Sequence, residues 1–294
     1  MKDTKGGSNI KRKVIKYAIN IFAVLIAIVG LFSFVYPTIA NYIADKNALQ
    51  EINSYNSAIE QLDEKELKSK KEASQQYNSR LSSPVMEENP KKDNNQVFQN
   101  GEMIAYISIP KLKLSLPIYE GTDEGILNKG TGHVKGSSLP CGGKSTHSII
   151  IGHSGLGTAE IFSNLEKLNN GDVFTIKYLD DTLKYKIDSI KTVKPDKVQK
   201  YTQIIEGKDY CTLMTCTPIT VNTHRLIVRG VRIKEKPSQT KTVETLPTEK
   251  ATTKAIERVK ENGVLWIPVV IVCLCAAIVV VALCRHRRSR KHEK

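Results

Sequence analysis

Length and charge set the first limits on this chain of 294 residues, whose formal net charge is +14. The length leaves room for one or two domains. Residues 1–16 and 285–294 each contain six Lys or Arg and one acid, so each tail carries +5 and only +4 remains between them. Because the basicity is confined to two short tails, a nucleic-acid partner is a poor explanation of the charge.

Two apolar runs adjoin these tails. Residues 17–36 are interrupted only by Asn20, Gly30 and Ser33, and residues 264–284 contain no charge. With a rise of about 1.5 Å per residue, either run is long enough to cross roughly 30 Å of hydrocarbon as a helix. We therefore predict a transmembrane helix at each run.

The basic tails predict the orientation of both helices, because Lys and Arg beside a membrane span remain on the cytoplasmic side. Both termini are then cytoplasmic, and residues 37–263 lie outside the cell membrane. A cleaved signal peptide is the alternative for the first run, but that run is longer than the usual apolar core of a signal peptide. We favour an uncleaved anchor.

The segment 37–99 is predicted to form an extracellular helix followed by a flap. Residues 82–95 contain two prolines, many polar side chains and no periodicity, which indicates a loop or flap. At the other end, residues 234–262 are rich in Lys, Thr and Glu and cannot bury a core, so we expect a linker. The helix is predicted from apolar residues that recur mostly every three or four positions: Tyr42, Leu49, Ile52, Tyr55, Ile59 and Leu62.

Residues 100–233 contain the short apolar runs of a β domain. Turn signals such as Asn169-Asn170-Gly171 separate the runs, and only residues 159–168 favour a helix. Several short strands with few helices predict a mainly β fold, either a barrel or a sandwich. The expected strands are 103–109, 112–119, 148–152, 172–179, 182–193, 210–215 and 225–233.

Three of the six cysteines are expected to lie outside the membrane, because Cys273, Cys275 and Cys284 fall in the second apolar run. An odd number of external cysteines suggests a reactive thiol or an intermolecular bond. The external ones are Cys141, in a Pro-Cys-Gly-Gly turn, Cys211, expected to be buried in a strand, and Cys216.

Cys216 is the external cysteine best placed to react. It ends an apolar run and precedes Thr217-Pro218, where the chain must leave the strand. A thiol at a strand end faces a loop, where a substrate can reach it. From spacing alone, Cys216 could equally be a nucleophile or an inert cysteine.

A nucleophilic thiol needs an acid or base and a group that stabilises an oxyanion. His153 follows three consecutive isoleucines, where a buried strand opens into a turn, whereas His133 and His147 have ordinary interpretations as turn or strand-edge residues. Arg225 lies nine residues after Cys216, enough for a tight loop that brings neighbouring strands together. Two interpretations of Arg225 are open: it places a fixed positive charge beside the thiol, or it is a solvated charge at the end of a strand.

Two segments closely resemble the TLxTCTP…NTHRLxVRG signature of class C sortases: residues 212–218 (TLMTCTP) and 222–230 (NTHRLIVRG). The resemblance covers residues 100–233 and, more loosely, the arrangement with two anchors. It implies the eight-stranded sortase β-barrel with short helices, preceded by the amphipathic helix and flanked by two transmembrane helices. Further matching segments are Ile109-Pro110-Lys111, Leu116-Pro117-Ile118-Tyr119, Gly132-His133, Ser138-Leu139-Pro140 and Gly152-His153 with Gly155-Leu156.

The resemblance implies a cysteine transpeptidase that uses no cofactor or metal. Cys216 would attack the Thr–Gly carbonyl of a Leu-Pro-x-Thr-Gly-like sorting signal, and Arg225 would stabilise the oxyanion. His153 would protonate the leaving amine and later accept a proton from the incoming amine, which in class C is a pilin lysine. We also expect Thr215 and Thr217, which flank the nucleophile, to contact the substrate.

The sequence departs from the family at several points. Class C sortases usually carry an Asp-Pro-aromatic lid, but Ser83-Pro84-Val85 has neither the acid nor the ring. Ser154 stands where the family generally has Arg. Cys211 is also unexpected, and a disulfide to Cys216 along one strand is geometrically unfavourable.

Two alternatives remain open at this stage. One is a housekeeping-type sortase that attaches surface proteins to a cell-wall amine. The other is a non-catalytic surface or pilin subunit, which would carry its own sorting signal. Residues 246–250 (LPTEK) echo such a signal but lack the Thr-Gly bond that would be cut.

Overall fold

The computed structural model describes residues 5–82 and 97–233. Most of the predicted flap at 82–95 lies outside the described residues. So do the predicted linker at 234–262, the second apolar helix at 264–284 and the basic tail at 285–294.

The first apolar run belongs to α1 (Lys5–Glu60), one helix that continues through Pro37. By length and composition, its segment Ile15–Glu60 could cross a membrane. The predicted anchor and most of the predicted amphipathic helix therefore belong to one continuous helix, and Leu62 lies beyond its end. The chain divides into two units after Pro37, and Thr38–Pro237 is the unit that contains the barrel.

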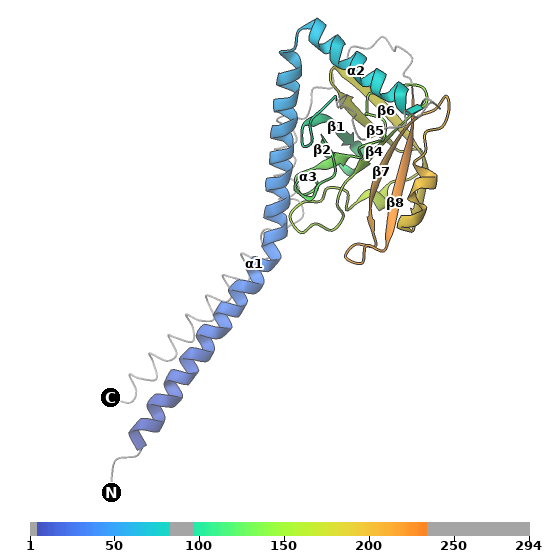
Figure 1. The fold of residues 1–294 in the computed structure, drawn as a ribbon. Helices are drawn as coiled ribbons and strands as arrows, with labels where there is room; N and C mark the ends of the chain where they lie inside the picture. Colours follow the sequence, from blue (N-terminus) through green and yellow to red (C-terminus); the bar gives the residue numbers. More distant parts are fainter. Residues whose placement is uncertain (1–4, 83–96, 234–294) are drawn as a thin grey trace. The chain divides into compact units, whose positions relative to one another are not determined.

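Eight strands close into a barrel in the order β1-β2-β3-β4-β7-β8-β6-β5, which confirms the predicted fold (Figure 1). Each strand expected from the sequence is present, with ends shifted by one or two residues at most. The strands are β1 (Met103–Ile109), β2 (Leu114–Glu120), β3 (Thr131–His133), β4 (Thr146–Ile151), β5 (Val173–Tyr178), β6 (Asp181–Val193), β7 (Asp209–Thr217) and β8 (His224–Arg232).

The short elements are where the sequence-based prediction was incomplete. β3 was missed because three residues give no periodicity. The helix expected at 159–168 is instead a series of turns that ends in the 3-10 helix η3 (Leu165–Lys167). The remaining elements are α2 (Glu64–Ser82), η2 (Pro110–Leu112), α3 (Glu124–Leu127), η3 (Leu165–Lys167) and η4 (Pro195–Tyr201).

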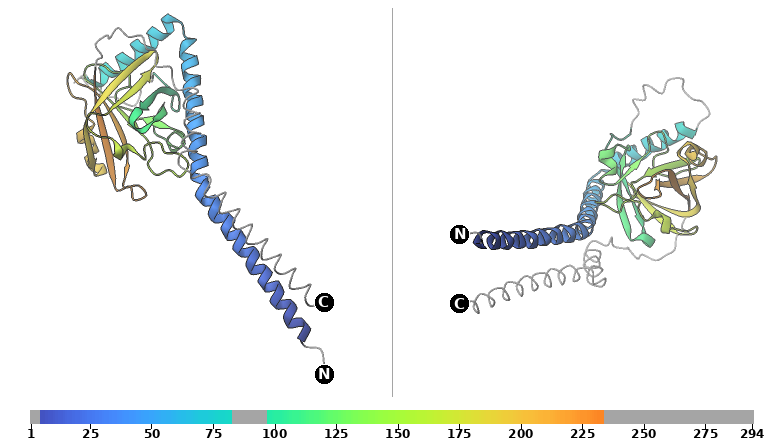
Figure 2. Two further views of the ribbon diagram at one scale, coloured as in Figure 1. Left: turned by 180° about the vertical axis from the view of Figure 1, so that it is seen from behind. Right: turned by 90° about the horizontal axis from the view of Figure 1, so that it is seen from below.

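The helix α2 crosses one end of the barrel, as two further views show (Figure 2). Polar contacts hold it there: the Ser74 hydroxyl bonds the Tyr178 hydroxyl inside the barrel. Asn78 accepts from the Leu139 N–H at 2.7 Å and donates to the Leu139 carbonyl at 3.1 Å. Because the buried Asn78 amide pairs with both backbone groups of Leu139, it fixes α2 on the barrel although α2 has no periodic apolar face.

The part of α1 after Thr38 docks on the barrel through a small cluster around Tyr55. The Tyr55 hydroxyl donates to the Ile104 carbonyl and accepts from the Leu179 N–H, both at 2.8 Å. Its ring meets the Tyr106 ring edge-on, and Ile52 is buried beside it. One phenol oxygen thereby satisfies two buried backbone groups on β1 and after β5.

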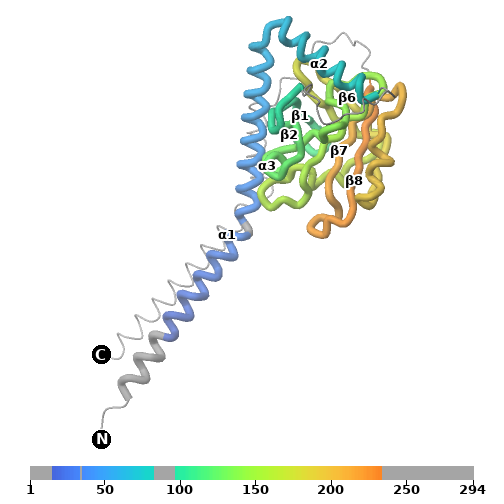
Figure 3. The backbone as a smooth tube through the Cα atoms, viewed as in Figure 1, coloured from blue at the N-terminus to red at the C-terminus, as the bar shows by residue number. Residues whose placement is uncertain are grey.

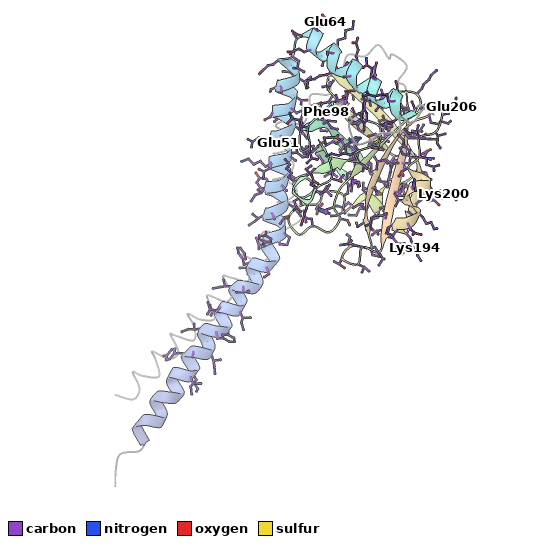
Figure 4. The ribbon with its side chains drawn as sticks, in the orientation of Figure 1. Glu51, Glu64, Phe98, Lys194, Lys200 and Glu206 are labelled. Atoms are coloured by element: carbon purple, nitrogen blue, oxygen red, sulfur yellow. The ribbon has the colours of Figure 1, made fainter. Side chains whose placement is uncertain are left out.

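A second apolar cluster, here the outer cluster, lies on the outside of the barrel wall. Side chains along β7 alternate between the two faces of the barrel wall. Cys211 and Leu213 therefore pack in the core, whereas Met214 packs in the outer cluster. The segment from Lys194 through Lys200 to Glu206, labelled in Figure 4, runs along the barrel beside β8. The outer cluster consists of Ile149, Met214 and Ile227 with Val134, Ile151, Val193, Val198 and Tyr201.

His147 ties the segment after η4 to β7. Its ring nitrogens bond the Gln203 carbonyl at 2.8 Å and the Thr212 hydroxyl at 2.7 Å. Burial lowers the pKa of His147 below its ordinary value of 6.5, because the charged form loses solvation; nearby Arg229 acts in the same direction. The neutral imidazole accepts at one nitrogen and donates at the other, which fits one carbonyl and one hydroxyl.

Replacing Tyr55 by Phe removes one oxygen and leaves a buried carbonyl and a buried N–H without a partner. We expect the free energy of unfolding to fall by about 1–3 kcal/mol. Denaturant unfolding of the purified protein measures it, with Tyr42→Phe as the matched control because the Tyr42 ring is exposed. Equal effects of the two changes would contradict the docking role.

His147 is expected to make stability depend on pH. The unfolded chain binds a proton near pH 6.5, while the fold still holds the imidazole neutral. Its stabilising contribution is thus present above pH 6.5 and is lost as the pH falls toward the lower pKa of the folded state. The free energy of unfolding should decline less steeply between about pH 7 and about pH 5 in His147→Gln than in the native protein. Equal slopes in urea titrations would contradict this.

Candidate active site

Strand β7 lies between β4 and β8 in the barrel wall, and β7 and β8 run side by side (Figure 3). Its register with β4 is parallel, with Ile151 opposite Met214, and its register with β8 is antiparallel. The end of β4, the end of β7 and the start of β8 therefore meet at one edge of the barrel.

Cys216 sits at this edge, half-buried and with a free thiol. Successive side chains of a strand point to opposite faces, so Cys216 shares the outer face with Met214 of the outer cluster. The sequence-based prediction of a thiol at a strand end is confirmed. The half-buried thiol lies on the same face as the apolar side chains of the outer cluster.

Arg225 is directly opposite Cys216 in the antiparallel register of β7 and β8. Side chains of directly opposed residues project from the same face about 5 Å apart at Cβ. The Arg225 Nη1 donates to the carbonyls of Asn222 and His224, each at 3.1 Å. These bonds hold the guanidinium at the strand end, and the group has five N–H donors in all, so others can serve an anionic ligand.

His153 is the second residue after β4, and its neighbours are bonded to β7. The Gly152 N–H donates to the Met214 carbonyl at 3.2 Å. The Thr215 hydroxyl donates to the Gly152 carbonyl at 2.7 Å. The half-buried imidazole is thus carried by backbone that is fixed to the strand bearing Cys216.

Glycines permit the tight packing of this turn. A Cβ at Gly152 would lie 2.8 Å from side-chain atoms of both Ile161 and Phe162. Gly155 has a φ of +70°, and a Cβ there would lie 2.3 Å from Ile219. The loop between β7 and β8 therefore closes onto the turn that follows His153.

The two threonines expected to contact the substrate differ in their surroundings. Thr215 is buried with its hydroxyl on Gly152, and Thr217 is half-buried at the end of β7, opposite His224. The bond from Thr215 to Gly152 shows that this side chain supports the His153 turn. Substrate contact by either threonine remains a prediction.

The other two described cysteines are poor nucleophiles. Burial raises the pKa of Cys141 to about 12 and raises the pKa of Cys211 well above its ordinary value. Both therefore remain protonated at neutral pH. Cys211 is fully buried in β7, as its sequence position predicted, and it is not bonded to Cys216.

The remaining histidines of the barrel have structural partners. His133 is buried in β3 and bonds Glu120 at 2.7 Å, and His224 bonds the neighbouring Thr223 hydroxyl at 3.0 Å. His133 was expected at a turn or a strand edge, and its burial beside a carboxylate was not predicted. Among residues 5–82 and 97–233, no cluster of three or more His, Cys, Asp or Glu side chains could hold a metal ion.

The site thus joins a thiol, an imidazole-bearing turn and a guanidinium at one edge of a barrel. A thiol can attack a carbonyl carbon, a positioned imidazole can transfer a proton, and a fixed guanidinium can stabilise an oxyanion. These are the groups needed for acyl transfer through a thioester. Sequence reasoning did not find the hydroxyls of Thr215 and Ser154 that join the turn to β7, because a hydrogen bond between distant segments leaves no local pattern.

Comparisons with known proteins agree with this geometry. A family model described as the sortase domain matches residues 107–233. Sortase C1 of Streptococcus agalactiae is 42% identical, with 64% of this chain and 100% of that chain covered at a TM-score of 0.59. A Clostridium perfringens sortase C, solved with the C-terminal cell wall sorting motif, is 37% identical, with 64% and 100% covered at a TM-score of 0.60.

The similarity extends to curated relatives over a shorter span. Sortase A of Bacillus anthracis is 29% identical over 138 residues, which are 46% of this chain and 62% of that protein. This chain thus matches less than two thirds of that relative, whereas it covers the solved sortase C chains in full. The chain belongs to the sortase family, and its likeness to the sortase C structures places it in class C.

Proposed function

We propose that the chain cleaves a Leu-Pro-x-Thr-Gly-like sorting signal between Thr and Gly and transfers the acyl group to a lysine amine of a pilin subunit. The observation that carries the proposal is the pairing of Cys216 with Arg225 beside a turn that presents His153. The class C relatives favour pilin lysine over a cell-wall amine as acceptor. The Clostridium perfringens relative was solved with a sorting motif, which supports a peptide of this class as substrate.

In the first half-reaction the Cys216 thiol gives its proton to His153, and the sulfur forms a bond to the Thr carbonyl carbon. The carbonyl oxygen becomes an oxyanion, and N–H groups of Arg225 stabilise it, a role that suits an always-charged planar guanidinium. As the C–N bond breaks, His153 gives its proton to the departing Gly amine. The product is a thioester between Cys216 and Thr.

In the second half-reaction a lysine amine attacks the thioester carbonyl. His153 accepts a proton from the attacking nitrogen, and the C–S bond breaks to release the Cys216 thiolate. The product is an isopeptide bond between Thr and Lys, and repetition joins subunits into a covalent polymer. No metal or cofactor takes part in the proposed cycle.

The apolar side chains of the outer cluster favour a substrate that itself has apolar residues next to the scissile bond. Met214 and Ile227 pack two residues along from Cys216 and Arg225 on the same face. Ile151, Val193 and Val198 of this cluster are only partly buried. Leu and Pro of a sorting signal would find apolar surface beside the thiol, with Thr215 and Thr217 near the scissile residue.

The membrane arrangement is part of the same proposal. α1 would anchor the chain through residues 17–36, and residues 264–284 would form a second span. Both termini would then be cytoplasmic, with the barrel outside the cell, where pilin subunits and wall precursors are found. A barrel attached to the membrane surface would meet substrates that are themselves membrane-anchored.

Replacing Cys216 by Ala should abolish the covalent product while leaving the protein folded. Incubation with a pilin that carries the sorting signal should give a ladder with the native chain and none with the variant. Cys141→Ala is the matched control, because its thiol is protonated. That thiol contacts Asn78 of α2 and lies away from the end of β7 that carries Cys216. Mass spectrometry should find Thr joined to a lysine side chain. Polymer from the variant would refute the nucleophile, and an adduct to wall peptide alone would refute the pilin acceptor.

Replacing Arg225 by Lys keeps the charge but removes the planar fork. Loss of one oxyanion donor typically costs about 10²–10³ in kcat, so we expect a loss of about 10²-fold with a much smaller change in KM. Steady-state cleavage of a fluorogenic sorting peptide measures both constants. Arg229→Lys is the matched control on the same strand, because Arg229 pairs with Asp188 at 2.8 Å instead of facing Cys216. Equal losses in the two variants would contradict the oxyanion role.

A further inference from the structure

Both neighbours of His153 are bonded to the strand that carries Cys216, but they use different groups. On the preceding side, Gly152 is bonded through its backbone to Met214 and to the Thr215 hydroxyl. On the following side, the Ser154 side chain donates its hydroxyl proton to the carbonyl of Cys216, at 2.5 Å. His153 is therefore held between bonds to three consecutive residues of β7.

The Ser154 bond differs from the others that hold this turn. The Phe162 N–H donates to the His153 carbonyl, and the Gly155 N–H donates to the Ser163 hydroxyl, both at 2.9 Å. These two bonds attach the turn to the segment that follows it. The Ser154 bond instead attaches the turn to the backbone of the nucleophile itself.

We propose that Ser154 is a positioning residue whose hydroxyl sets the placement of the His153 imidazole relative to the Cys216 thiol. This inference rests on the proposed transpeptidation and names a further residue needed for it. Ser154 is half-buried, so water competes only partly for the Cys216 carbonyl. Without the hydroxyl, the turn keeps its bonds on the Gly152 side and to the 162–163 segment, but it is released where it meets Cys216.

The position of this bond explains why it bears on the reaction. A general acid must lie within hydrogen-bond reach of the atom that it protonates, and a thiol pairs with an imidazole only over a short distance. A displacement of 1 Å can cost about 10²-fold in rate. Release of one side of the turn, with the other bonds kept, should cost about tenfold in kcat.

The test uses variants that separate the hydroxyl from the volume of the side chain. Ser154→Ala removes the hydroxyl, Ser154→Thr keeps it, and Ser154→Val has the shape of Thr without it. Ser163→Ala is the matched control, because it removes a hydroxyl that bonds the same turn at Gly155 but does not reach β7. If Ser154→Ala fails to fold, the comparison of Thr with Val decides.

Two readouts are needed on the full-length protein. The first is kcat and KM for cleavage of a fluorogenic sorting peptide. The second is the rate of iodoacetamide alkylation at Cys216 as a function of pH, assigned to this cysteine by mass spectrometry of its peptide. The alkylation profile reports the pairing of thiol and imidazole, and it does not require the chain to cleave a sorting signal.

The proposal expects kcat to fall about tenfold in Ser154→Ala and Ser154→Val, with KM within about twofold of the native value. Ser154→Thr should retain most of kcat, and Ser163→Ala should stay within about twofold of native. The pH dependence of the alkylation rate at Cys216 should differ from that of the native protein in Ser154→Ala and Ser154→Val, and should be unchanged in Ser154→Thr.

Three results would overturn the positioning role. They are native kcat in Ser154→Ala, an equal loss in Ser163→Ala, and equal activities of the Thr and Val variants. If the native chain cleaves no sorting peptide, the proposed function fails. The alkylation profiles then decide the role of Ser154 alone, and identical profiles in the Thr and Val variants would refute it.

Discussion

The register of β7 between β4 and β8 is the constraint on which the active site depends. The parallel pairing with β4 sets Ile151 opposite Met214, so that the next residue, Gly152, can bond the Met214 carbonyl. The antiparallel pairing with β8 sets Arg225 opposite Cys216. A slip of one residue would turn Cys216 toward the barrel core and Cys211 and Leu213 outward. The buried side chains of the core therefore also fix which face carries the thiol.

The barrel was largely predictable because its strands are short apolar runs separated by turn residues. β1 was placed at its observed bounds, and β4 followed from three consecutive isoleucines. Neither β3 nor α2 could be placed in this way. β3 has three residues, and α2 is held by Ser74 and Asn78 through contacts with distant segments rather than by a continuous apolar stripe. The prediction of a helix at 159–168 was wrong because Ile161 and Phe162, whose apolar side chains suggested it, lie in a turn and pack against Gly152.

The chemical groups of the site were predictable to different degrees. A strand end followed by Thr-Pro indicated that the Cys216 thiol was accessible, while the roles of His153 and Arg225 came mainly from resemblance to class C sortases. The geometry adds a physical reason for both: a direct cross-strand register for Arg225, and bonds from β7 to both neighbours of His153. The bond from Ser154 to Cys216 carries the proposed positioning role of a residue that the sequence marked only as a departure from the family.

The central claim is that an acyl group passes through a thioester on Cys216. The most direct measurement is rapid mixing of the native protein with a sorting-signal peptide without an acceptor amine, followed by acid quench and peptide mass mapping. The account predicts that the tryptic peptide spanning residues 209–225 gains the mass of the acyl fragment ending in Thr, and that hydroxylamine removes it. An acyl group on another residue, or cleavage without any transient adduct on Cys216, would contradict the account.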